Sequence, residues 1–126
     1  MDKKELAVTL KHNGYNCAQA VLCAFVKETG LSEDLLKQLG AGFGVGMGCM
    51  EATCGALIGA QIIMGLKKYK AVPVLKNARE LHQAFTEKCG ASICKDLKGR
   101  DTGKVICECD DCVRCAVELA EKILAI

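Results

Sequence analysis

Aromatic residues are scarce in this 126-residue chain, which has no tryptophan, two tyrosines and three phenylalanines. Proteins that bind nucleic acids combine base-stacking aromatic residues with clustered basic ones. Here lysine and arginine are spread along the chain, no basic block is visible, and the net charge is only +2. The sequence therefore predicts no nucleic-acid partner.

A long uninterrupted hydrophobic run is also lacking. The most apolar stretch, residues 45–66, contains Glu51, Gln61 and several glycines. Its unbroken part is shorter than the roughly 20 residues that span a bilayer. No apolar run follows the charged residues at the N-terminus, so a signal peptide is not indicated. We expect no membrane segment and a cytoplasmic location.

Proline is represented by Pro73 alone, and no alternating strand pattern of useful length is present. Alanine, leucine, lysine and glutamate dominate, which favours helix over sheet. The fold class predicted is all-α, a compact bundle of about six helices in a single domain of residues 1–126. The expected helices are residues 2–12, 17–29, a short helix capped by Ser32, 51–68, 74–88 and 110–125. Asn16 and Gln19 form a predicted capping box, and Ser92 is expected to cap a short turn around Cys94.

Glycine stands at every second position from Gly40 to Gly48. This spacing predicts a loop with unusual dihedral angles or close backbone approach, placed before a buried central helix. The amides of Gly44, Gly46 and Gly48 are candidate donors to the sulfur of Cys49 or of Cys54. The alternative is that the glycines only permit close helix packing.

Ten cysteines are the most informative feature of the composition. In a chain that can build a hydrophobic core and shows no export signal, they favour metal ligation or thiol exchange over a disulfide scaffold. They are Cys17, Cys23, Cys49, Cys54, Cys89, Cys94, Cys107, Cys109, Cys112 and Cys115.

The densest cysteine cluster has the pattern C-x-C-x-x-C-x-x-C, from Cys107 to Cys115. Its C-x-x-C-x-x-C core is typical of one class of iron–sulfur loop. A helical wheel of the last helix turns Cys109 and Cys112 to the buried face and leaves Cys115 at the border. Cys23 and Cys89, in contrast, read as small buried packing residues.

Cys17, Cys94 and Cys109 each fall at or just before the predicted start of a helix. A helix N-terminus presents free N–H groups and partial positive charge. That environment lowers the pKa of a thiol and stabilises an anionic cluster. These three positions are therefore candidate sites of thiolate or metal chemistry.

Several blocks of the sequence, in order over nearly the whole chain, resemble the C_GCAxxG_C_C family of redox-active proteins. The blocks are residues 14–21 (GYNCAQAV), 42–48 (GFGVGMG), 54–60 (CGALIGA), 94–99 (CKDLKG) and 109–116 (CDDCVRCA).

This resemblance implies similarity to a domain of split-Soret cytochrome c, which is all-helical and dimeric and has four cysteines linked to an iron–sulfur centre. The implied partner is a second copy of the chain. Haem is not implied, because a haem-attachment sequence is missing. The fourth ligand is open between Cys109 and Cys112, because the last block offers both. The ligands implied by the resemblance are Cys17, Cys54, Cys94 and Cys109.

Three functions remain for comparison. The first is electron transfer or redox sensing through an iron–sulfur cluster bound by four cysteines, with a redox partner protein that the sequence does not identify. The second is thiol–disulfide exchange with Cys54 or Cys109 as nucleophile. The third is a zinc-stabilised helical module without catalytic activity. No Ser-His-Asp or paired-carboxylate arrangement indicates another kind of enzyme.

Overall fold

The computed structural model describes residues 2–70 and 73–126, and within these ranges it contains helices and no strand. The predicted all-α class is therefore confirmed. The helices are α1 (Lys3–His12), α2 (Cys17–Ala24), α3 (Val26–Thr29), α4 (Glu33–Gly40), α5 (Gly44–Met47), α6 (Gly55–Lys68), α7 (Leu75–Cys89), α8 (Cys94–Lys98) and α9 (Cys109–Leu124).

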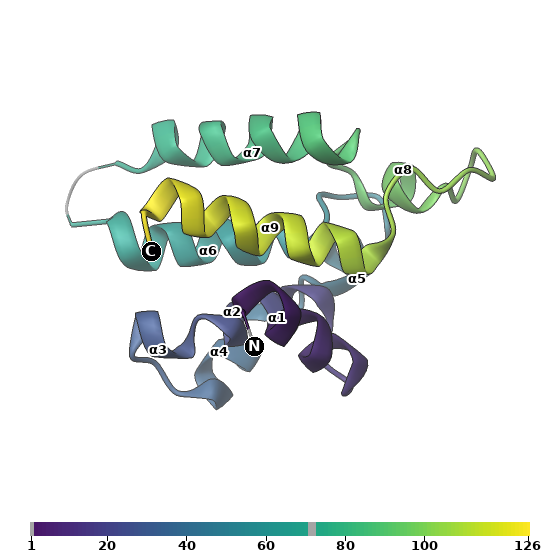
Figure 1. Ribbon diagram of the computed structural model, residues 1–126. Helices are drawn as coiled ribbons and strands as arrows, with labels where there is room; N and C mark the ends of the chain where they lie inside the picture. Colours follow the sequence, from purple (N-terminus) through teal and green to yellow (C-terminus); the bar gives the residue numbers. More distant parts are fainter. Residues whose placement is uncertain (1, 71–72) are drawn as a thin grey trace.

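The centre of the bundle is α6, which packs against α2 on one side and α9 on the other, while α7 covers α9 (Figure 1). Leu57 and Ile63 of α6 are fully buried, as are Leu22 of α2 and Phe85 of α7. A Cβ atom on Gly59 would lie 2.9 Å from the carbonyl oxygen of Ala18. The small residues of α6 thus permit a close crossing of α6 and α2.

The helix expected over residues 17–29 is broken at Phe25, where the backbone leaves helical geometry (φ −105°, ψ 22°). The Phe25 ring remains fully buried, and α3 continues from the next residue. The sequence offers neither glycine nor proline at this point. The break therefore has no local sequence signal, and we attribute it to tertiary packing.

The central helix begins at Gly55, four residues later than predicted, because the preceding segment pairs with the start of α8. The N–H of Cys54 donates to the carbonyl of Ser92 at 2.8 Å, and the N–H of Cys94 donates to the carbonyl of Ala52 at 3.0 Å. A single antiparallel bridge joins Thr53 and Ile93. These backbone bonds place the beginnings of α6 and α8 side by side.

The glycine-rich loop contains one distorted helical turn, α5. Val45 and Gly46 both lie in the left-handed region, with φ of 55°. A Cβ atom on Gly46 would lie 2.5 Å from the Cβ of Cys94, so the backbone passes directly against α8. The unusual dihedral angles and close approach predicted for this loop are both observed.

Helix ends follow most of the predicted signals. Asn16 and Gln19 form the capping box at the start of α2, and Ser32 accepts a hydrogen bond from the N–H of Leu35. Ser92 does not cap α8; Ile93 occupies that position and provides no side-chain bond. Among the described helices, none combines the length and apolar character needed to cross a bilayer.

Candidate functional site

Eight of the ten cysteines interact with one another, seven through thiol hydrogen bonds and Cys94 through the charges of Cys54 and Cys17. The helix ends that carry most of them lie at the end of the bundle where α5 and α8 are found (Figure 1). All ten cysteines are free thiols. The two outside this set are Cys23, whose Sγ lies 3.9 Å from the carbonyl oxygen of Glu33, and Cys49, which is exposed. The eight are Cys17, Cys54, Cys89, Cys94, Cys107, Cys109, Cys112 and Cys115.

Four of these cysteines stand at helix starts. Cys17, Cys94 and Cys109 are the first residues of α2, α8 and α9, as predicted, and Cys54 is the N-cap of α6. The four helices come from distant parts of the chain, yet their first turns meet. We define this set, Cys17, Cys54, Cys94 and Cys109, as the helix-start group.

Cys17 and Cys109 form the closest pair of the helix-start group. A hydrogen bond from the Cys109 thiol lowers the pKa of Cys17 to about 6, with a further contribution from the N–H of Val45. The same bond, together with burial, raises the pKa of Cys109. In the reduced chain the pair therefore favours a thiolate on Cys17 and a proton on Cys109.

Cys54 and Cys94 complete the helix-start group. A hydrogen bond from the Cys112 thiol lowers the pKa of Cys54, and the amides of Ala56 and Leu57 act in the same direction. Burial raises the pKa of Cys94, and the neighbouring charges of Cys54 and Cys17 add to that effect. The buried sulfurs of Cys17, Cys54 and Cys94 therefore lie within electrostatic range of one another.

Glycines around the group leave room for the cysteine sulfurs. A Cβ atom on Gly55 would lie 2.5 Å from the Sγ of Cys17. The N–H of Gly48 donates to the carbonyl of Gly44 at 2.8 Å, so it is not the sulfur donor that the sequence suggested. In this loop the amide that faces a cysteine of the helix-start group is that of Val45.

A second set of cysteines lies against the first. The Sγ atoms of Cys89, Cys107 and Cys112 are all within 4.8 Å of one another, and such a group could hold a metal ion. The neighbouring thiols of Cys112 and, to a smaller extent, Cys115 lower the pKa of Cys89. The pKa of Cys115 is raised, mainly by its hydrogen bond with Cys89. We call these four residues the α7–α9 group. Its link to the helix-start group is the contact between Cys54 and Cys112.

The structure differs from the sequence interpretation at three cysteines. Cys89 is no simple packing residue, because the end of α7 places it beside the cluster on α9. Cys115 is buried, because α7 covers that side of α9. Cys109 is only partly buried, so it is more accessible than Cys115, and the order expected from the wheel is reversed.

A surface hollow of about 370 Å³ opens beside Cys109. Asp110 lies in its wall and accepts hydrogen bonds from Lys11 at 2.9 Å and from His12 at 2.7 Å. His12, which has no acidic partner close in sequence, thus finds one across the fold. The hollow gives solvent and small molecules a route to the edge of the helix-start group.

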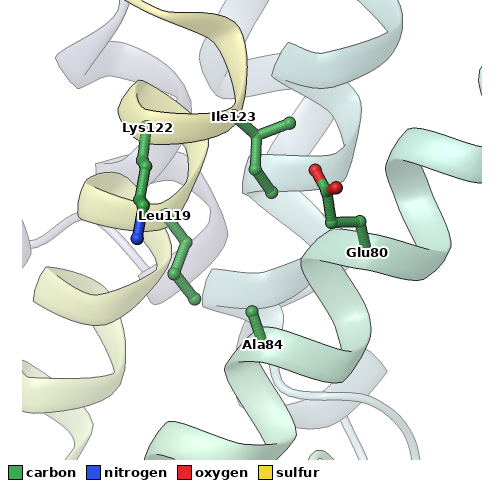
Figure 2. Close-up of a pocket in the computed structure, with 5 residues that line it drawn as sticks. All are labelled: Glu80, Ala84, Leu119, Lys122 and Ile123. Carbon is green, nitrogen blue, oxygen red and sulfur yellow. The ribbon is translucent and has the colours of Figure 1, made fainter.

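Another hollow, of about 420 Å³, lies between α7 and α9 and is lined by Glu80, Ala84, Leu119, Lys122 and Ile123 (Figure 2). No cysteine lines it. This groove is therefore separate from the cysteine groups.

Comparison with known proteins gives one match. A family profile described as "Putative redox-active protein (C_GCAxxG_C_C)" matches residues 15–123, which include all of the cysteines. No curated protein and no solved structure matches the chain.

Proposed function

Because this chain belongs to the C_GCAxxG_C_C family, we propose that it transfers or senses electrons through an iron–sulfur cluster bound by four cysteines. The ligands are those of the helix-start group, Cys17, Cys54, Cys94 and Cys109. Between the two candidates for the fourth ligand we favour Cys109, because it begins α9 and its thiol contacts Cys17. Cys112 contacts Cys54, but its sulfur also lies within 4.8 Å of those of Cys89 and Cys107.

The observation that carries this proposal is the meeting of four cysteines at the starts of four helices. Iron–sulfur clusters are held by cysteine thiolates, and hydrogen bonds to sulfur tune their potentials. The donor set fits that chemistry, because backbone amides already face Cys17 and Cys54. When bound, the cluster would supply one-electron chemistry.

The charges around the group also suit an anionic centre. The positive ends of α2, α6 and α9 face it, and Lys98 is close enough to Cys17 to stabilise its thiolate. Lys11 acts in the same way on Cys109. The chain itself therefore offsets the negative charge of the thiolates.

Anaerobic purification with visible absorption and iron and sulfide analysis tests the proposal. We expect the wild-type protein to be coloured and to contain matched amounts of iron and sulfide. Both the colour and the iron and sulfide should be lost in Cys17→Ser and in Cys94→Ser. Cys23→Ser is the matched control, because this buried thiol lies outside both groups. A folded protein that takes up no iron when cluster is supplied would refute the proposal.

A second function, thiol–disulfide exchange, is favoured by the contact between Cys17 and Cys109. A thiolate stabilised near neutral pH beside a protonated thiol is the arrangement that attacks a partner disulfide. Cys17 would form a mixed disulfide with the partner protein. Cys109 would then displace the partner, which leaves with two thiols while Cys17 and Cys109 become a disulfide.

Of the two nucleophiles suggested by the sequence, Cys109 does not fit this function, since its pKa is raised. Reduction of a disulfide substrate by the metal-free protein, with a small dithiol as the terminal reductant and abolished in Cys17→Ser, would support this function.

Cytoplasmic location and a homodimer form part of the proposal. A reducing compartment keeps thiols free for cluster or exchange chemistry. The dimer is implied by the family resemblance, and sedimentation of the purified chain tests it: a monomer at micromolar concentration would exclude a stable dimer.

A further inference from the structure

The α7–α9 group could form a site separate from the proposed cluster. It contains Cys89 at the end of α7, Cys107 in the segment before α9, and Cys112 and Cys115 on α9. Three of these four lie outside the ligand set that the family resemblance and the sequence analysis indicated. A cluster of four thiols on one side of the helix-start group therefore needs its own explanation.

From the sulfur positions, we infer that the α7–α9 group is a second metal site, which binds Zn²⁺ or another thiophilic cation with a filled d shell. Tetrahedral zinc with Zn–S bonds of about 2.3 Å holds its sulfurs about 3.8 Å apart. The sulfurs of Cys89, Cys107 and Cys112 already lie within 4.8 Å of one another. Small side-chain adjustments bring them to the spacing of a bound ion.

The fourth ligand is Cys115. It lies one helical turn after Cys112, on the same side of α9, which is the C-x-x-C spacing common in zinc sites. Its thiol contacts Cys89 and lies near the charge of Cys107. Cys115 is buried, so a role on the surface is excluded.

The backbone holds Cys107 over the end of α7. The amides of Ile106 and Cys107 both donate to the carbonyl of Leu97, at 2.9 Å and 3.3 Å. Gly90 ends α7 in the left-handed region, and a Cβ atom there would lie 2.7 Å from the Cγ2 of Ile106. The segment before α9 therefore closes on α7 only because position 90 has no side chain.

Burial and charge also suit a thiolate site. Cys89 and Cys112 are buried, whereas Cys107 is partly exposed and gives a metal ion access from solvent. Four thiolates around a divalent cation carry a net negative charge, and Lys88 lies near both Cys89 and Cys115. Asp111, near Cys107, acts in the opposite direction.

This inference does not depend on the proposed iron–sulfur centre. Cys112 and Cys54 join the two groups through a thiol hydrogen bond, and each group retains its other members without it. The two sites can therefore be tested one at a time.

The experiment is Co²⁺ titration of the full-length, reduced, metal-free protein under anaerobic conditions, followed by displacement with Zn²⁺. Tetrahedral thiolate coordination gives intense charge-transfer and d–d absorption. The double variant Cys17→Ser/Cys94→Ser disables the helix-start group. We expect it to bind one equivalent of Co²⁺, which Zn²⁺ displaces.

Adding Cys107→Ser to this double variant should weaken both the Co²⁺ binding and its charge-transfer absorption, because three thiolates remain, and adding Cys23→Ser should leave both unchanged. Cys107 is chosen because it is partly exposed, and circular dichroism reports whether the fold is kept. Cys115→Ser should retain binding with weaker charge-transfer absorption, as expected for three thiolates.

The inference is overturned if the double variant, still folded, binds no Co²⁺, or if Cys107→Ser leaves the spectrum intact. An unchanged spectrum in Cys115→Ser would overturn the assignment of the fourth ligand. Wild-type protein that takes up no iron when cluster is supplied, together with Co²⁺ binding in the double variant, would refute the proposed function alone, so the two failures are distinguishable.

Discussion

Gly55 is the residue against which the Cys17 sulfur packs. A Cβ atom there would lie 2.5 Å from that sulfur and 2.5 Å from the carbonyl oxygen of Phe43. We expect Gly55→Ala to displace Cys17 and to lower the free energy of unfolding by about 1–3 kcal/mol, the usual effect of overpacking. Urea denaturation and metal content measure the two effects.

Gly65→Ala is the matched control in the same helix. Its Cβ atom would meet nothing within 4 Å, and alanine is favoured over glycine in a helix by about 0.5–1 kcal/mol. We expect this variant to be slightly more stable with full metal content. Equal loss of metal in both variants would show that α6 tolerates no substitution and that the contact with Cys17 is not special.

The Cys17–Cys109 pair makes stability depend on pH in the reduced, metal-free chain. The hydrogen bond from Cys109 lowers the folded-state pKa of Cys17 from 9.0 to about 6. A lowered pKa contributes stability that is fully present above the unfolded value and is lost as pH falls through the folded one. The Cys17 contribution should therefore grow from pH 6 to pH 9.

The urea midpoint measured at pH 6 and pH 8 tests this sign. We expect the midpoint to rise with pH in the wild type and to rise less in Cys109→Ala, which removes the donor. The raised pKa of Cys109 has the opposite effect and lowers stability as pH rises, but only above its unfolded value of 9.0. An identical pH slope in the two proteins would contradict the assignment.

Among the helices, the start of α2 connects local sequence to the site. Asn16 accepts a hydrogen bond from the N–H of Gln19 at 2.7 Å, and its side chain also donates to the carbonyl of Gly40 at 3.2 Å. We expect Asn16→Ala to lower the free energy of unfolding by about 1–2 kcal/mol, because it removes a helix cap. It should also weaken metal binding, since Cys17 is the next residue.

Ser32→Ala separates the two effects in that prediction. Ser32 caps α4 through the N–H of Leu35 at 3.1 Å and does not adjoin a cysteine of either group. We expect Ser32→Ala to lose a comparable amount of stability and to keep its metal affinity. Thermal denaturation and metal titration measure these two quantities. If both cap variants weaken metal binding alike, the effect is one of general stability.

Across the whole molecule, the cysteine groups join segments that are distant in sequence. The starts of α2, α6, α8 and α9 and the end of α7 all contribute thiols. A ligand that binds only the folded chain stabilises it in proportion to its affinity and concentration. Metal removal should therefore lower the melting temperature of the whole protein.

Hydrogen exchange locates that effect. After chelation we expect protection to fall most at the first turns of α2, α6 and α9 and in residues 99–108, which lead into α9. The middle of α6 should stay protected because its side chains form the core. Uniform loss of protection, or none, would contradict a metal-dependent end of the bundle.

Local patterns in the sequence were sufficient for much of the fold. Helix periodicity, the Asn16 capping box and the glycine stops depend on contacts within a few residues, so they are readable without a structure. For the same reason the positions of Cys17, Cys94 and Cys109 at helix starts could be predicted. Cys54 was singled out by its place after the glycine-rich loop, but its role as a ligand came from the family resemblance.

Tertiary structure alone decided which thiols meet. Cys89 joins Cys107 and Cys112 because α7 lies along α9, a contact that no short-range pattern encodes. Likewise, the late start of α6 follows from its pairing with the segment before α8. Helical elements arise from interactions a few residues apart, whereas the grouping of sulfurs arises from side-chain packing between distant segments. The sequence by itself therefore determined the helices and the available chemistry, and only the fold determined which thiols are neighbours.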